Sequence, residues 1–470
     1  MLLWRRLETH AAAQPGKLAL ACAGSRLTYT DLATQARRVA AGWIRQGLQP
    51  GERIALHMKN GTDLAVCYYA CFAAGFVAVP INNRFKAAEV EYVLEHSGAR
   101  LYLADPGLRI ETRLSAGVFD GDGPAVPLEP GAADLPALLL YTSGTTARPK
   151  GVIHTQGTLA GNASYMEAAG LTAADHTLLF TPMVHASGAI MLLMSSLWVG
   201  ASVTIVPAFD AGVVLDTWVE SGATIYMGLP TLIRALVAEQ QRQPRPIVTG
   251  RLAIAGGDAV PVPLQQEYTA LFGHPIVEGF GMTEGLPTIL NRPQDNRPGS
   301  MGRAMGDVEL RVAEDGELCM RGSGVTPGYW GEAPFEDGWL KTGDLVTLDS
   351  AGFVWFRGRK KEIVIRGGSN LSPQEIEEAL YKHPAVAEAG VIGEPDAYWG
   401  EVPVAFVALR PEHQPAPGEA ELIDFAKLHL ADYKVPARIE FLPVLPKGTT
   451  GKVQRRALKE RSEERRLAAN

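Results

Sequence analysis

Apolar positions in the first part of the chain recur with two periods, one typical of helices and one of strands. Residues 30–46 form an amphipathic pattern that predicts a helix, with Thr30 as its N-cap and Gly47 as its stop. Further helices are predicted at 61–75 and 86–96, and strands at 53–57, 76–80 and 101–104. This alternation predicts βαβ units, and therefore a parallel sheet covered by helices on both faces.

The same alternation continues after a connection rich in Gly, Pro and Asp at 105–136. Strands are predicted at 178–180, 202–206, 224–227, 252–255 and 275–278. The nearly uncharged stretch 188–207 has the length of a membrane span, but Gly200 divides it. We therefore expect a buried helix at 188–199 and a strand at 201–206.

The pattern changes after Pro293, where short strands are predicted at 309–312, 316–321 and 352–356. A smaller unit begins near Arg359, with helices at 373–383 and 418–430 and strands at 386–393 and 403–409. The predicted fold class is α/β, with a large N-terminal domain of layered βαβ sheets that includes a short-stranded β subdomain (1–358). A small α+β C-terminal domain follows (359–470).

Composition narrows the function classes. The 470 residues are 46% hydrophobic and 20% charged, as in a globular protein, and the net charge of −7 argues against nucleic-acid binding. The four cysteines lack metal-site spacing, and no apolar signal segment opens the sequence. We expect a cytoplasmic protein without integral membrane association. The sequence leaves the oligomeric state open, a homodimer included.

The segment Leu138–Gly151 carries the first candidate chemistry. An apolar strand runs into Tyr-Thr-Ser-Gly-Thr-Thr-Ala-Arg-Pro-Lys-Gly, a loop of hydroxyls, small residues and one lysine. Small residues let backbone N–H groups approach phosphate oxygens, and Lys150 adds a positive charge. The spacing of a Walker A loop is absent, so an ordinary surface loop is an alternative for this segment alone.

This loop resembles the [YF]-T-S-G-[ST]-T-G-x-P-K-G motif of the acyl-adenylate-forming superfamily, in its acyl-CoA synthetase branch. The resemblance implies ATP binding by Thr142, Ser143, Gly144, Thr145, Thr146 and Lys150. The chain departs from the motif at Ala147, where the family usually has glycine. The extra methyl group restricts positive φ but leaves the N–H donors in place.

Three further motifs extend the resemblance over almost the whole chain. In Gly279-Phe280-Gly281-Met282-Thr283-Glu284 it implies that Phe280 packs on adenine, Thr283 binds the α-phosphate and Glu284 binds Mg²⁺. Asp344, in Lys-Thr-Gly-Asp, and Arg359 would contact the ribose. Lys452, in Pro-Lys-Gly-Thr-Thr-Gly-Lys, would bridge carboxylate and phosphate during adenylation.

The resemblance also implies an acyl pocket and a route for the thiol. The pocket would be lined by Val184, His185, Gly256, Gly257, Asp258, Gly281, Met282 and Leu286, with His185 closing over the acyl-adenylate. The C-terminal domain would rotate about Lys361, and Gly367 and Gly368 would admit the pantetheine arm of coenzyme A. These glycines are equally compatible with a tight turn.

The expected activity is therefore that of an ATP-, Mg²⁺- and CoA-dependent acid–thiol ligase. Because most of the predicted lining is apolar and lacks arginine, we expect a medium-chain aliphatic or an aromatic monocarboxylic acid as substrate. One alternative is an adenylating enzyme that loads a carrier protein. An inactive nucleotide-binding protein is the alternative from another class.

Overall fold

The computed structural model describes residues 1–112, 114–116, 128–142, 149–258, 260–411, 413–448 and 453–469. The chain divides into two compact units, which are described separately. The first comprises residues 1–257, 265–310 and 320–340, and the second comprises 258–264, 311–319 and 341–470. In the described parts of the chain, no helix is both long enough and apolar enough to cross a membrane.

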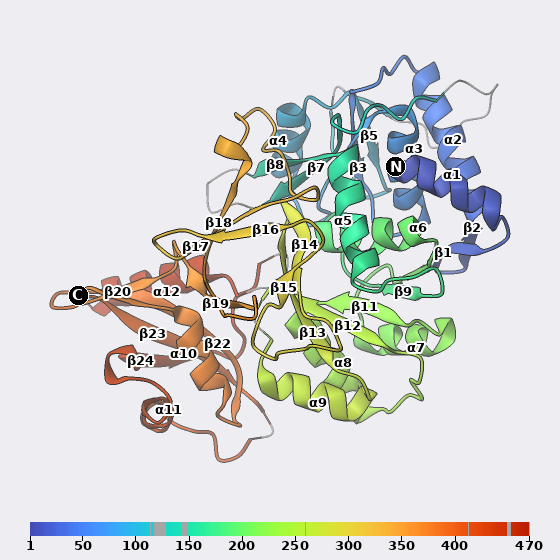
Figure 1. Ribbon diagram of the computed structural model, residues 1–470. Helices are drawn as coiled ribbons and strands as arrows, with labels where there is room; N and C mark the ends of the chain where they lie inside the picture. Colours follow the sequence, from blue (N-terminus) through green and yellow to red (C-terminus); the bar gives the residue numbers. More distant parts are fainter. Residues whose placement is uncertain are drawn as a thin grey trace. The chain divides into compact units, whose positions relative to one another are not determined.

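Two sheets form the first unit (Figure 1). The six-stranded sheet has the order β6-β5-β3-β4-β7-β8, and the nine-stranded sheet has the order β15-β14-β13-β12-β11-β9-β10-β1-β2. Their strands are β1 (Leu18–Cys22), β2 (Ser25–Thr28), β3 (Arg53–His57), β4 (Val77–Pro80), β5 (Leu101–Ala104), β6 (Ser115–Ala116), β7 (Pro136–Thr142), β8 (Lys150–Thr155), β9 (His176–Leu179), β10 (Ser202–Ile205), β11 (Ile225–Gly228), β12 (Leu252–Gly256), β13 (Ile276–Met282), β14 (Gly285–Leu290) and β15 (Arg303–Ala304).

The parallel pairing predicted from the sequence is confirmed in the interior of both sheets. Antiparallel pairs lie towards three of the four edges: β8 pairs with β7, β14 with β13 and with the edge strand β15, and β2 with β1, whereas the edge strand β6 is parallel to β5. Short connections permit this, because an antiparallel pair needs only a hairpin whereas a parallel pair needs a crossover. Both hairpins β7–β8 and β13–β14 carry predicted site motifs.

Helices pack against these strands. They are α1 (Leu3–Ala13), α2 (Tyr29–Arg45), α3 (Thr62–Ala74), α4 (Ala87–Ser97), α5 (Gln156–Ala168), the π-helix η1 (Ser187–Met194), α6 (Ser195–Val199), α7 (Ala211–Ser221), α8 (Pro230–Arg242) and α9 (Val262–Phe272). Every residue of α3 except Asp63 is buried, as its continuous apolar run from Leu64 requires, and the helix belongs to the largest core cluster.

Two helix predictions need correction. The N-cap of α2 is Thr28, not Thr30, because the Thr28 hydroxyl accepts from Asp31 N (3.1 Å) while the Asp31 carboxylate accepts from Thr28 N (2.9 Å). The helix predicted at 188–199 is buried, but its first part is the π-helix η1. At its C-terminal end, the Ile190 carbonyl accepts both from the Ser195 backbone N–H five residues later and from the Ser195 hydroxyl (2.9 Å).

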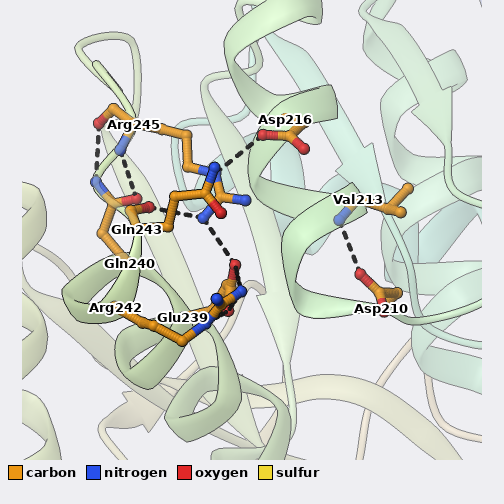
Figure 2. A network of polar contacts seen from close by, with 8 residues as sticks. All are labelled: Asp210, Val213, Asp216, Glu239, Gln240, Arg242, Gln243 and Arg245. Atoms are coloured by element: carbon orange, nitrogen blue, oxygen red, sulfur yellow. Dashed lines mark hydrogen bonds and ion pairs between the residues drawn. The ribbon is translucent and has the colours of Figure 1, made fainter.

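A polar network fixes α7 against α8 (Figure 2). Arg245 follows α8 and donates to Asp216 of α7 and to Glu239 of α8, each at 2.9 Å. The Gln240 side chain exchanges two hydrogen bonds with the Arg245 backbone. Because both acidic partners share one guanidinium, the loop that leads towards β12 is held at a defined position.

The second unit contains most of the four-stranded sheet β16-β17-β18-β19 and a sheet in which β21, β20, β23 and β22 are neighbours and β24 pairs with β23. The strands are β16 (Glu309–Val312), β17 (Glu317–Arg321), β18 (Leu340–Leu348), β19 (Val354–Arg359), β20 (Val364–Arg366), β21 (Ser369–Leu371), β22 (Val386–Asp396), β23 (Gly400–Leu409) and β24 (Arg438–Phe441). Its helices are α10 (Pro373–Tyr381), α11 (Glu419–Lys427) and α12 (Arg455–Ala469), and the 3₁₀ turns are η2 (Glu336–Gly338, in the first unit) and η3 (Asp432–Lys434). The α/β fold class with a large N-terminal and a small C-terminal domain is confirmed.

Candidate functional site

The β7–β8 hairpin places Thr142 directly opposite Lys150 at the base of the predicted phosphate loop. Ser143, Gly144, Thr145 and Thr146 of that loop, with Ala147, lie outside the described residues. Gly151 follows Lys150, and a Cβ there would lie 3.2 Å from the Tyr141 ring and 3.3 Å from Trp330 Cβ. Glycine is therefore needed so that the segment containing Trp330 can lie against β8.

Thr283 and Glu284 form the two-residue turn between β13 and β14, where Met282 pairs with Gly285. Hydrogen bonds from distant segments hold the backbone of this turn. The His154 Nε2 donates to the Thr283 carbonyl (2.7 Å), and Thr326 N donates to the Glu284 carbonyl (2.7 Å). The backbone carbonyls of both turn residues are thus hydrogen-bonded, and these bonds do not use the side chains of Thr283 and Glu284.

Tyr329 brings the phosphate-loop lysine and the turn carboxylate together. Its hydroxyl donates to Glu284 Oε1 (2.8 Å), and the Lys150 ammonium lies 4.7 Å from its ring centroid. Lys150 also pairs with Glu332 (2.9 Å). Burial, and then the Glu284 charge, raises the pKa of Tyr329, so the hydroxyl stays protonated as a donor.

Glu284 suits a magnesium ion that takes part of its coordination from a polyphosphate. Its side chain is buried, with the residue 6% exposed, and one carboxylate oxygen is fixed by Tyr329. Among the described residues, no three His, Cys, Asp or Glu side chains gather as a multi-ligand metal site. Magnesium is commonly held by one or two carboxylates together with phosphates and water, so the single carboxylate of Glu284, on the tyrosine that Lys150 also contacts, fits this ion.

His185 lies just before η1 and is half-buried. Burial, assisted by the Arg84 charge, lowers the pKa of His185 to about 4, so its imidazole is neutral near pH 7. The Asn82 amide nitrogen lies 3.4 Å from Nε2. A neutral, oriented ring can lie beside an uncharged acyl group without a second charge in the pocket.

Of the remaining predicted pocket residues of the first unit, Val184 lies in the turn before η1, and the others lie at the ends of β12, β13 and β14. Gly256 pairs with Gly279, and a Cβ on Gly256 would lie 2.6 Å from the Gly279 carbonyl oxygen. Phe280, Met282 and Leu286 are partly buried against the main core, and Val184 is buried. A Cβ on Gly281 would displace the end of the Leu286 side chain and lie 3.1 Å from the Gly285 carbonyl oxygen, so glycine leaves room for Leu286 there. Gly257 adopts a φ of +86°, and the contacts of Asp258 assign it to the second unit.

In the second unit, Asp344 and Arg359 are cross-strand partners on β18 and β19. Arg359 Nε lies 3.2 Å from Asp344 Oδ1; the Asp344 side chain is 3% exposed, whereas that of Arg359 is 48% exposed. The buried carboxylate is thereby compensated and oriented. Such a carboxylate can accept from two vicinal hydroxyl groups, as the predicted ribose contact requires.

Lys361 lies in the turn that follows β19, and Gly367 and Gly368 form the turn of the β20–β21 hairpin. Their φ values are +55° and +82°, which a two-residue hairpin of this hand requires. The tight-turn interpretation of the two glycines is therefore confirmed. Lys452 lies outside the described residues.

Several residues that complete the first unit's cluster were not predicted from the sequence. They are His154, Thr326, Tyr329 and Glu332. Tyr329 and its partner Glu284 are 45 residues apart, and His154 and Thr283 are 129 apart. No spacing rule links such positions. The only local feature near Tyr329 is the run Gly328-Tyr329-Trp330. It contains no charged group, so it did not indicate a phosphate- or metal-binding site.

Comparisons with known proteins place these observations in a family. Residues 7–330 match the AMP-binding enzyme family, and residues 375–452 match the C-terminal domain of AMP-binding enzymes. A feruloyl-CoA synthase from Amycolatopsis sp is 33% identical over 476 residues, which covers 94% of this chain and 95% of that protein.

Solved structures agree over nearly the whole length. MatB from Rhodopseudomonas palustris with bound ATP is 30% identical and has a TM-score of 0.90, covering 98% of this chain and 99% of that one. The o-succinylbenzoate coenzyme A synthetase MenE from Bacillus subtilis, in complex with ATP and magnesium ion, is 31% identical with a TM-score of 0.86, covering 98% and 99%.

Proposed function

Because this chain belongs to the AMP-binding enzyme family, we propose that it is an ATP-dependent carboxylic acid–CoA ligase. The observation that carries the proposal is the cluster in which Lys150 and Glu284 meet on Tyr329. It supplies a cation for phosphate beside a carboxylate for magnesium. Relatives of similar length that are named as CoA ligases or synthetases support the same activity.

In the first half-reaction, a carboxylate oxygen of the acid attacks the α-phosphorus of ATP, and the bond to pyrophosphate breaks. Lys150 and the donors of the Thr142–Thr146 loop would hold the departing phosphates, with Thr283 at the α-phosphate. Magnesium, bound through Glu284, would neutralise phosphate charge. Lys452 would lie between the two reacting anions and reduce their repulsion.

In the second half-reaction, the thiolate of CoA attacks the carbonyl of the acyl-adenylate, and AMP leaves. Asp344 and Arg359 would retain the ribose through both steps. We propose domain limits of 1–358 and 359–470, with rotation about Lys361 exchanging Lys452 for the Gly367–Gly368 turn. The MatB and MenE structures align with 98% of this chain, which includes residues of both proposed domains, and this supports the proposed division.

We propose a medium-chain aliphatic or an aromatic monocarboxylic acid as the substrate. The buried Val184 and the partly buried Met282 and Leu286 are apolar and favour an apolar acyl group. His185, with its pKa lowered to about 4, adds no positive charge that would pair a second carboxylate. The aromatic acid in the name of the feruloyl-CoA synthase relative supports the aromatic choice.

The direct test is a panel of short, medium, long and aromatic carboxylic acids, with pyrophosphate release measured in the presence of ATP, Mg²⁺ and CoA. With at least one acid, an acyl-CoA thioester should form and AMP should be released. Thioester formation on a carrier protein, but not on CoA, would replace the proposal with the carrier-loading alternative. Nucleotide binding without pyrophosphate release would support the inactive nucleotide-binding alternative, and absence of both would refute the proposed function altogether.

A half-reaction test addresses Lys452 separately. Lys452→Ala should nearly abolish acyl-adenylate formation while sparing thioester formation from supplied acyl-adenylate. Equal loss of both half-reactions would contradict the role. We further propose a cytoplasmic location and a homodimer, which cell fractionation and light scattering coupled to gel filtration would test.

A further inference from the structure

Tyr329 lies on a segment that runs beside β8, the strand that begins with Lys150. Trp330 N donates to the Gly151 carbonyl (2.7 Å), and Ile153 N donates to the Gly328 carbonyl (3.1 Å). Val152 and Tyr329 form an isolated antiparallel bridge between these bonds. The backbone of Tyr329 is therefore fixed relative to the strand that carries the lysine.

The same segment is tied to the turn that carries the carboxylate. Thr326 N donates to the Glu284 carbonyl (2.7 Å), and the Thr326 hydroxyl contacts the carbonyls of Ile153 (2.5 Å) and Gly328 (2.9 Å). Tyr329 thus occupies a short bridge between β8 and the Thr283–Glu284 turn. Phe335 packs edge-on against its ring, with centroids 5.6 Å apart, which restricts the ring's rotation.

The two ends of the Tyr329 side chain meet opposite charges. Its hydroxyl fixes one oxygen of the buried Glu284 carboxylate, and its ring face lies near the Lys150 ammonium. A hydrogen bond to a carboxylate is directional, and the ring face attracts a cation. The ring face thus adds to the Lys150–Glu332 ion pair (2.9 Å) in holding the ammonium, while the hydroxyl holds the Glu284 carboxylate.

We propose that Tyr329 is a positioning residue that holds Lys150 and Glu284 at the separation required by magnesium-bound polyphosphate. The hydroxyl serves the carboxylate, and the ring serves the ammonium. The inference rests on the proposed function, because it presumes that these two groups bind Mg²⁺ and phosphate.

The test uses the full-length chain and calorimetric titration of ATP, with Mg²⁺ or with EDTA, in the absence of any acid. Tyr329→Phe removes only the hydroxyl, so the half-saturating Mg²⁺ concentration should rise about tenfold while ATP binding in EDTA stays within about twofold. Tyr329→Leu also removes the ring face that lies near the Lys150 ammonium. The affinity for pyrophosphate should therefore be about two- to fivefold lower in Tyr329→Leu than in Tyr329→Phe.

Tyr165→Phe is the matched control. Tyr165 is another tyrosine of the first unit whose hydroxyl donates to a carboxylate, that of Asp307 (2.6 Å), and it is buried. Its replacement should lower thermal stability to a similar degree without changing the Mg²⁺ dependence. A comparable Mg²⁺ effect in this control would show that the loss at Tyr329 is merely structural and would overturn the inference.

Three further results, two from the Tyr329 variants and one from the wild-type protein, would overturn the inference. An unchanged Mg²⁺ dependence in Tyr329→Phe would overturn the role of the hydroxyl. Equal weakening of ATP binding with and without Mg²⁺ would also overturn it, since general damage to the site acts on both. If the wild-type protein binds no Mg²⁺–ATP, the proposed function fails first, and this inference falls with it.

Discussion

His154 offers the sharpest test of how the first unit holds its Thr283–Glu284 turn. The imidazole has no exposed surface, and its Nε2 donates to the Thr283 carbonyl at 2.7 Å. Burial lowers the pKa of His154 to about 4, although the hydrogen bond to Thr283 opposes the shift. The informative replacements are His154→Leu, which removes both donor and titration, and His154→Gln, which keeps an amide donor.

Loss of the hydrogen bond and loss of the histidine titration change the free energy of unfolding by different amounts at different pH. At pH 7 the ring is neutral in both the folded and unfolded states, so His154→Leu should cost about 1–3 kcal/mol for the unpaired Thr283 carbonyl. As the pH falls below about 6.5, the unfolded chain binds a proton that the folded protein refuses until about pH 4. This single group therefore lowers the wild-type free energy of unfolding by about 2 kcal/mol between pH 7 and pH 5.

Thermal unfolding of the wild type and both variants, followed by tryptophan fluorescence from pH 7 to pH 5, measures these terms. A cooperative unit of roughly 300 residues has an unfolding entropy of about 0.6 kcal/mol/K, so 2 kcal/mol corresponds to roughly 3 °C in Tm. His154→Leu should melt below the wild type at pH 7, and the difference should shrink by about 3 °C at pH 5.

His154→Gln separates the hydrogen bond from the titration. It should stay close to the wild type at pH 7 and show the same weakened pH dependence as His154→Leu. Because every other histidine is common to the three proteins, their contributions cancel. Parallel Tm curves for the wild type and His154→Leu across this pH range would refute the buried, neutral state of the ring.

Three other replacements probe separate parts of the proposed site. Glu332→Gln should tighten Mg²⁺–ATP binding by up to about fivefold at low salt, because it releases Lys150 from an ion pair worth at most about 1 kcal/mol, and calorimetry should find no gain at high salt. Asp344→Asn should weaken ATP about tenfold but leave pyrophosphate binding unchanged, since Asp344 is proposed to contact only ribose; equal losses for both ligands would contradict this. Lys361→Pro should spare adenylation and impair thioester formation, measured as separate half-reactions; unaltered CoA transfer would refute the hinge.

Local physical chemistry accounts for what the sequence alone determined. Period-2 and period-3.6 patterns predicted most strands and helices to within a few residues, because burial on one face imposes the pattern directly. The strand-to-loop motif at Tyr141–Gly151 and the Gly279–Glu284 motif predicted nucleotide binding. A phosphate ligand requires glycines, hydroxyls and single charges at neighbouring positions in the chain, so such motifs can be recognised locally.

Tertiary structure decided which side chains serve those motifs. The capping of α2 by Thr28 rests on the hydrogen-bond pair that Thr28 makes with Asp31, and the π-helix η1 was not distinguished from an α-helix by its apolar sequence. Tyr329 and His154 reach the Thr283–Glu284 turn only because β8 and the 326–330 segment lie beside each other. Contacts between segments far apart in sequence leave no periodic trace, so the folded chain alone reveals that Lys150 and Glu284 share one tyrosine.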